Sequence, residues 1–110
     1  MPSYLKNEVV LVRYPFSDLT SSKVRPAVIV NAPHASQDIL IVPLTSRTAA
    51  LLAGEFVLAE WKKAGLNVET AAKRGIFTIH QTFVLKSIGR LLTVDAEKLE
   101  NSLREWLDLY

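Results

Sequence analysis

Residues 13–46 constrain the fold of this chain more than any other stretch. They read RYPFSDLTSSKVRPAVIVNAPHASQDILIVPLTS and contain two apolar runs, 27–30 and 39–42, each flanked by residues typical of loops and turns. Short β-branched runs with such boundaries predict strands rather than helices. A residue that precedes proline is held in extended geometry, so Arg25 begins the first of these strands on a stiff backbone.

The rest of the chain continues this pattern of short strands. We expect strands over residues 8–14, 27–31, 38–44, 55–58 and about 75–79. Residues 60–66 resemble a helical turn closed by Gly65, residues 83–86 are ambiguous, and residues 88–91 fit a short strand or a turn. Because proline cannot donate to a ladder, Pro43 should end its strand or lie at an edge.

The last segment has the clearest helical pattern. An apolar stripe at helical spacing is formed by Leu99, Leu103, Trp106, Leu107 and Tyr110. Asp95 is placed to cap the N-terminus of this helix, and Val94 and Leu99 occupy the two positions of a hydrophobic staple. The stripe should cover the sheet, and a partner-binding face is the alternative. Short strands with one terminal helix predict a small, strongly bent antiparallel sheet or barrel.

Composition restricts the class of protein. The 110 residues suffice for one domain, which we expect to span residues 1–110. The absence of cysteine excludes a disulfide scaffold, a thiol nucleophile and a zinc–thiolate site. The first residues lack the apolar core of a signal peptide, and no apolar run is long enough to span a bilayer. We therefore expect a cytoplasmic protein with no membrane partner.

Charge is distributed unevenly, although the net charge is only +2. Residues 95–110 hold five acids and two bases, a net charge of −3, so residues 1–94 carry +5. A basic body with a separate acidic segment suits an anionic partner that approaches the body.

Arg25 and Thr45 are the side chains that we select for chemistry. Each lies where an apolar run meets solvent, and a guanidinium held on a rigid strand is suited to bind a phosphate. The hydroxyls of Thr45 and Ser46 can donate to a phosphate oxygen or bond the local backbone as a turn. Taken alone, Arg25 also fits an ordinary surface arginine, so the residue types leave both interpretations open.

Other polar and aromatic residues have weaker claims. The loop over residues 15–23 is long for a hairpin connection, and long loops on small scaffolds tend to be functional. Contacts to the phosphates of an anionic partner are considered for Lys23, Arg47, Lys73 and Arg74. Phe16 and Phe77 are candidates for contacts to a planar ligand group, with burial in the core as the alternative. A ribonuclease-like acid–base pair of His34 and His80 is a further alternative, and no metal-ligand spacing occurs.

Four segments in register resemble the PemK/MazF family of toxin endoribonucleases. They are EVVLVRYPFSDLTSSKVRPAVIV, IVPLTS, KKAGL and KSIGRL, and the likeness extends from Val9 to about Trp106. The resemblance implies a small SH3-like antiparallel barrel with short helices and a C-terminal helix, assembled as a homodimer. It also implies the toxin of a type II toxin–antitoxin pair, with a cognate antitoxin protein as partner and a DNA-binding complex of the two.

The activity implied by the resemblance is cleavage of single-stranded RNA without a metal or any other cofactor. The family's catalytic arginine falls on Arg25 and its catalytic hydroxyl on Thr45, and the loop over residues 15–23 matches the loop that hoods the site. The residues expected to bind substrate are Phe16, Ser17, Asp18, Lys23, Ser46, Arg47 and Lys73. On chemical grounds the products would be a 2′,3′-cyclic phosphate and a 5′-hydroxyl, with the general base unassigned.

Two departures and two alternatives accompany this interpretation. Asn7-Glu8 stands where the family often has Gly-Asp, and the step before the fifth strand matches only loosely at residues 70–73. One alternative is a non-catalytic binder of the same fold, either a gyrase-directed toxin or a degenerate RNA-binding module. The other is an SH3-like domain that binds a peptide.

Overall fold

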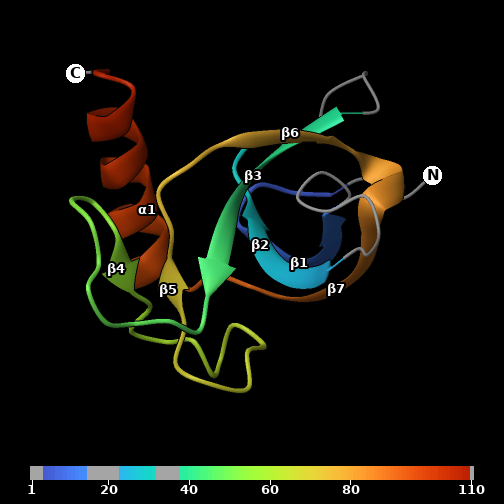
Figure 1. Cartoon of the computed structure of the whole chain (residues 1–110), viewed down its shortest axis with the longest axis horizontal. Coiled ribbons are helices and arrows are strands. Elements are labelled where there is room, and N and C mark those ends of the chain that lie inside the picture. Colours follow the sequence, from blue (N-terminus) through green and yellow to red (C-terminus); the bar gives the residue numbers. More distant parts are fainter. Residues whose placement is uncertain (1–3, 15–22, 32–37, 110) are drawn as a thin grey trace.

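The computed structural model describes residues 4–14, 23–31 and 38–109, without the side chain of Tyr14. Within these residues the chain forms a curled sheet with one helix beside it (Figure 1). The elements are β1 (Glu8–Tyr14), β2 (Lys23–Ile29), β3 (Asp38–Thr45), β4 (Phe56–Val57), β5 (Ala71–Ala72), β6 (Phe77–His80), the 3₁₀ helix η1 (Gln81–Phe83), β7 (Val84–Arg90) and α1 (Thr93–Trp106).

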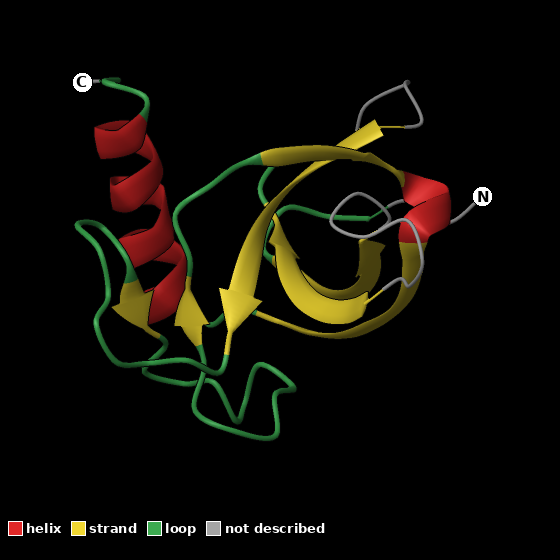
Figure 2. Cartoon of the chain, in the orientation of Figure 1, coloured by secondary structure: helices red, strands yellow, loops and turns green. Residues whose placement is uncertain are grey.

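All the described strand pairs are antiparallel, in the order β4-β5-β3-β2-β1-β7, and β6 also pairs with β3. The ribbon curls so that β6 and β7 face each other across β1 and β2 (Figure 2). No described pair joins β7 to β6 or β4, so the sheet is curved but not closed. The expected mainly β architecture with a C-terminal helix is confirmed.

Alternation along the strands produces two apolar layers. On one face, Val9, Val28 and Val42 are fully buried and pack with Leu99 of α1. On the other face, Val10 and Ile41 belong to a second buried cluster inside the curl of the sheet. Neither cluster covers the sheet around Leu11 and Val24, where Leu11 is only partly buried and Val24 is 41% exposed.

Several strand boundaries differ from the sequence prediction. β1 agrees, whereas β2 begins at Lys23 rather than at residue 27. β3 continues past Pro43, because residues 44 and 45 find a new partner in β5. β5 was not predicted, since two alanines have low strand propensity and are held by their neighbours. Residues 84–90 form one strand, which resolves the ambiguous region.

The N-terminus of α1 also corrects the prediction. The cap residue is Leu92, and Asp95 is the third residue of the helix. The Asp95 carboxylate, fully buried, accepts hydrogen bonds from the N–H groups of Ala59 and Glu60, at 2.8 and 2.9 Å. Val94 is 44% exposed and forms no staple. A local pattern thus suggested a cap where the carboxylate has a long-range structural role.

The apolar stripe of α1 covers the sheet, as expected for its first three members. Leu99 is buried, and Leu103 and Trp106 pack against the same cluster. Leu107 follows the end of the helix and is 52% exposed, so its assignment to the buried stripe was wrong. Tyr110 lies outside the described residues. No helix in the described part of the chain is long and apolar enough to cross a membrane.

Asn7 adopts the left-handed conformation that the turn before β1 requires and that a glycine would otherwise supply. Its φ is +74°, a left-handed conformation that asparagine tolerates better than most residues. Its N–H donates to the Ile29 carbonyl at 2.7 Å, and its carbonyl accepts from Leu91 at 2.8 Å. The altered residue pair therefore keeps the turn that starts the sheet.

Candidate active site

The candidate site lies where β2 and β3 separate. Their pairing runs from Ile29 opposite Ile41 to Ala27 opposite Pro43, and it stops before Pro26, which has no N–H to donate. The same antiparallel register, continued two residues further, brings Arg25 level with Thr45. Arg25 and Thr45 therefore lie on adjacent strands, just beyond their last paired residues, although 19 residues separate them in sequence.

Arg25 and Thr45 line one open groove with a volume of about 790 Å³. The remaining lining residues come from the sheet, from the chain just after β3 and from the segment before β5; they are Leu11, Val24, Pro26, Ser46, Arg47, Gly65, Leu66, Asn67, Val68, Thr70, Lys86 and Ile88. We call this the RP groove, after Arg25 and Pro26. Among its described lining residues, three are cationic and none is acidic.

The Arg25 guanidinium is exposed and largely available. One Nη1–H donates to the carbonyl of Val24 at 3.2 Å, which leaves other N–H donors of the fork for a ligand. None of the ion pairs between described residues involves Arg25, Arg47 or Lys86. A guanidinium without a carboxylate partner, aimed into a groove, is suited to an anionic ligand.

Thr45 makes the turn interaction that its sequence position suggested and keeps a donor for the other role. Its Oγ1 accepts a hydrogen bond from the N–H of Arg47 at 3.1 Å, which is the turn interaction. A hydroxyl has one donor in addition to its lone pairs, so this bond leaves the O–H proton for a ligand. The turn therefore orients the hydroxyl and also places Arg47 in the groove.

Residues 65–70 form the far wall of the RP groove, beyond the end of β3 and directly before the start of β5 (Figure 1). Gly65 has φ +99°, and a Cβ at this position would collide with the carbonyl oxygen of Ile88 in β7. A Cβ at Gly89 would likewise collide with the carbonyl oxygen of Ala64. Two glycines thus allow backbone to pack on backbone, which fixes the width of the groove.

Two of the predicted substrate contacts do not line the RP groove. Lys23 is exposed at the start of β2, and Lys73 is exposed just after β5, where its N–H donates to the Pro43 carbonyl at 2.9 Å. Lys73 also acts electrostatically on Glu55. Burial opposes ionisation of Glu55, but the N–H groups of Leu52 and Arg74 and the charges of Lys73 and Arg74 outweigh it and lower the pKa of Glu55.

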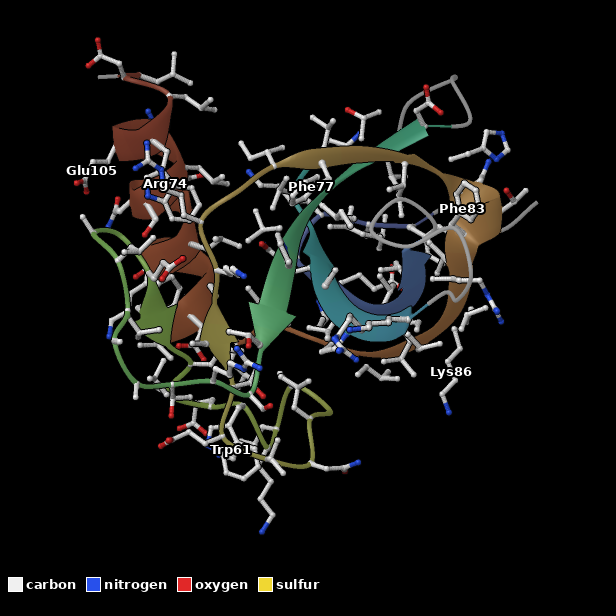
Figure 3. All side chains as sticks on the ribbon, in the orientation of Figure 1. Trp61, Arg74, Phe77, Phe83, Lys86 and Glu105 are labelled. Atoms are coloured by element: carbon white, nitrogen blue, oxygen red, sulfur yellow. The ribbon has the colours of Figure 1, made fainter. Side chains whose placement is uncertain are left out.

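Other assignments fall elsewhere. Phe77 is 40% exposed on β6, so burial in the core was the wrong expectation, and it does not line the groove (Figure 3). His80 caps η1, with its Nδ1 accepting from the N–H of Thr82 at 3.3 Å. The assignments of Phe16, Ser17 and Asp18 to substrate, and of His34 to an acid–base pair, lie outside the described residues and remain predictions.

Lys86, Asn67 and Val68 were not identified from the sequence. Lys86 lies opposite Leu11 in the β1–β7 ladder, and its side chain extends away from β7 (Figure 3). A lysine in an ambiguous segment has no local signal, and residues 65–70 contain no charged cluster. In the sequence, both regions were indicated only by the resemblance of KKAGL and KSIGRL to one family. The described residues include no group of three or more His, Cys, Asp or Glu side chains placed to hold a metal ion.

Comparison with known proteins adds the family to this geometry. A family model, described as the PemK-like, MazF-like toxin of type II toxin–antitoxin systems, matches residues 6–107. The chain belongs to this toxin family. Comparison with curated proteins gives no match.

Solved structures of MazF toxins share the fold. The Mycobacterium tuberculosis toxin MazF-mt6 aligns with a TM-score of 0.74 and 19% identity over 94% of this chain and 98% of its own. A MazE–MazF complex from Deinococcus radiodurans gives 0.79 and 13% over the whole of both chains. A mycobacterial endoribonuclease in complex with its cognate antitoxin gives 0.78 and 16% over 97% of each chain. At these identities, the likeness establishes the fold.

Proposed function

We propose that this MazF-family chain is an endoribonuclease that cleaves single-stranded RNA and leaves 2′,3′-cyclic phosphate and 5′-hydroxyl ends. The observation that carries the proposal is that Arg25 and Thr45 line one groove with no acidic residue among its described lining residues. A groove with cations and without acids binds a phosphate more favourably than it binds a cation or a neutral peptide.

RNA supplies its own nucleophile, so the protein needs none. The 2′-oxygen forms a bond to the adjacent phosphorus as it loses its proton, and the bond to the 5′-oxygen breaks as that oxygen gains a proton. Negative charge develops on the non-bridging oxygens in the transition state. Arg25 is placed to stabilise this charge, and the Thr45 hydroxyl to donate a second hydrogen bond that orients the phosphate.

The proton acceptor is not assigned to a protein side chain. Arginine stays protonated and cannot act as the base. His80 does not line the groove and is engaged at η1. The described residues thus leave the base unassigned between a deprotonated side chain, a water and the phosphate itself, with Arg25 and Thr45 acting by positioning and electrostatics.

The family also supports a partner proposal. Solved relatives include complexes with a cognate antitoxin or MazE. We propose that this chain forms a homodimer that a cognate antitoxin neutralises by occupying the RP groove with acidic side chains, since its three cations lack carboxylate partners in the described chain. Co-purification of the two proteins, lost at high salt, would support this pairing.

The reaction is tested with purified protein and single-stranded RNA in EDTA. We expect cleavage that EDTA does not inhibit, with products that polynucleotide kinase phosphorylates at the 5′ end. Arg25→Ala should lower the rate about 10²–10³-fold, while Arg104→Ala, which removes an exposed side chain of α1, should retain the wild-type rate. Full activity in folded Arg25→Ala would contradict the site, and RNA binding without cleavage would favour the degenerate binding module.

A further inference from the structure

The two sides of the RP groove differ in chemistry. Its sheet side carries Arg25 and Lys86, and the chain just after β3 adds Arg47. Its far wall, residues 65–70, contributes glycine, leucine, asparagine, valine and threonine to the lining but no charge. An RNA strand has the matching asymmetry, because its phosphates are charged and its bases are uncharged and planar.

We propose that this asymmetry orients the RNA strand and that Asn67 determines sequence specificity. The phosphates lie along Arg25, Arg47 and Lys86, and the base next to the scissile phosphate lies against Val68, with its edge read by the Asn67 amide. The inference rests on the proposed ribonuclease function and goes beyond it by assigning the residue that selects the base.

Asn67 is available for this contact. It is exposed in the groove, and its side chain makes no hydrogen bond to any other described residue. An amide offers two donors and an acceptor, which suits it to the edge of an unpaired base. Its neighbour Val68 is 55% exposed, an apolar surface on which a base can pack.

The far wall is held in place before any ligand binds. The N–H of Leu66 donates to the Trp61 carbonyl at 3.1 Å, and the Thr70 hydroxyl donates to the Val68 carbonyl at 2.8 Å. Glu69, the acid in this segment, accepts from the Thr48 hydroxyl at 3.1 Å and does not line the groove. A recognition segment whose backbone is held on both sides of Asn67 loses little conformational entropy on binding, which favours selectivity.

Lys86 provides the opposite contact. It is exposed on β7, lines the groove and has no ion pair with a described carboxylate. A lysine is a point charge that attracts phosphate without discriminating between bases. Lys86 and Asn67 should therefore separate affinity from specificity.

The test maps 5′ ends after cleavage of a randomised single-stranded RNA pool. We expect Asn67→Ala to reduce the base preference at one position beside the cut about tenfold. Asn67→Asp, which only accepts hydrogen bonds, should shift that position away from uracil and toward the bases whose amino groups donate, which are guanine, cytosine and adenine. Asn101→Ala, an exposed asparagine of α1, is the matched control and should leave the profile unchanged.

The second arm measures affinity. Lys86→Ala should raise KM several-fold for every sequence and reduce the slope of log KM against log salt by about 0.7, whereas Lys63→Ala should change neither. An unchanged cut-site profile in both Asn67 variants, with active wild type, would overturn the inference and leave the ribonuclease proposal intact. A randomised pool left uncut by wild-type protein would overturn both.

Discussion

Two hollows on this small chain differ in the charges of the residues that line them. The RP groove collects three cations and no acid among its described lining residues. The second hollow, about 460 Å³ between the turn before β1, the end of β7 and α1, is lined by two bases and two acids, Lys6, Arg90, Glu97 and Glu100. We call it the helix-side hollow.

This difference in charge separates charged side chains that pair with each other from those that are available to a ligand. In the helix-side hollow, Lys6 Nζ lies 3.3 Å from Glu100 Oε1, and both side chains are about half exposed. In the RP groove, Arg25 donates to the neighbouring Val24 carbonyl, and no described carboxylate pairs with it. Paired exposed charges contribute little stability and bind no ligand, whereas cations left without partners at the end of a sheet are available to an anion.

The largest effect is expected when the segment that leads to the far wall of the RP groove loses its hydrogen bonds to α1. Asp95→Ala leaves the N–H groups of Ala59 and Glu60 without their acceptor, beneath the turn that leads to Gly65. An unsatisfied buried donor costs about 1–3 kcal/mol and these two are partly buried, so the free energy of unfolding should fall by about 1–3 kcal/mol in total. Urea denaturation measures it, and a loss below 0.5 kcal/mol (about the scale of a surface change) would contradict the role assigned to Asp95.

Charge reversal compares the two hollows directly. Arg47→Glu places an acid in the RP groove and should weaken RNA binding about tenfold, which corresponds to about 1.4 kcal/mol. Arg90→Glu makes the same change in the helix-side hollow and should alter RNA binding less than about twofold. Equal effects of the two variants, measured by fluorescence anisotropy at one salt concentration, would remove the distinction between the hollows.

Acid titration tests the electrostatic interaction of Lys73 with Glu55. The lowered pKa of Glu55 means that its carboxylate stabilises the fold above its ordinary pKa near 4.5, and this contribution is lost as pH falls through the lower folded value. Wild type should therefore exceed Glu55→Gln in the free energy of unfolding at pH 6, and the difference should shrink below pH 4.5. A constant difference between pH 6 and pH 3 would refute the electrostatic role.

The smallest effect is expected at the ion pair of the helix-side hollow. Lys6→Met removes the contact with Glu100 between two half-exposed side chains. Such pairs contribute about 0–1 kcal/mol, so urea denaturation should change little and RNA cleavage not at all. A cleavage defect in Lys6→Met would show that the helix-side hollow also participates in function.

The near side of the site was predictable from sequence because its signals are local. Proline fixes the backbone after Arg25, and two apolar runs define strands whose pairing brings Thr45 to the same end of the sheet. β5 was missed, because its pairing with β3 outweighs the low strand propensity of Ala71 and Ala72.

The far wall was not predictable, because it depends on contacts between distant segments. Gly65 and Gly89 matter through the backbone that each approaches, which no local pattern reveals. Asp95 was misassigned for the same reason, since its partners are more than 30 residues away. Lys73 stays a prediction as a substrate contact, because it does not line the groove and its charge acts on the nearby Glu55.

A double-mutant cycle on RNA cleavage tests the central claim that Arg25 and Thr45 act on one phosphate. Arg25→Ala and Thr45→Val should each lower the single-turnover rate about 10²-fold or more. Because residues that act as a unit are not additive, the double variant should be only slightly slower than the worse single variant. A double variant whose loss equals the product of the two single losses would contradict the shared site.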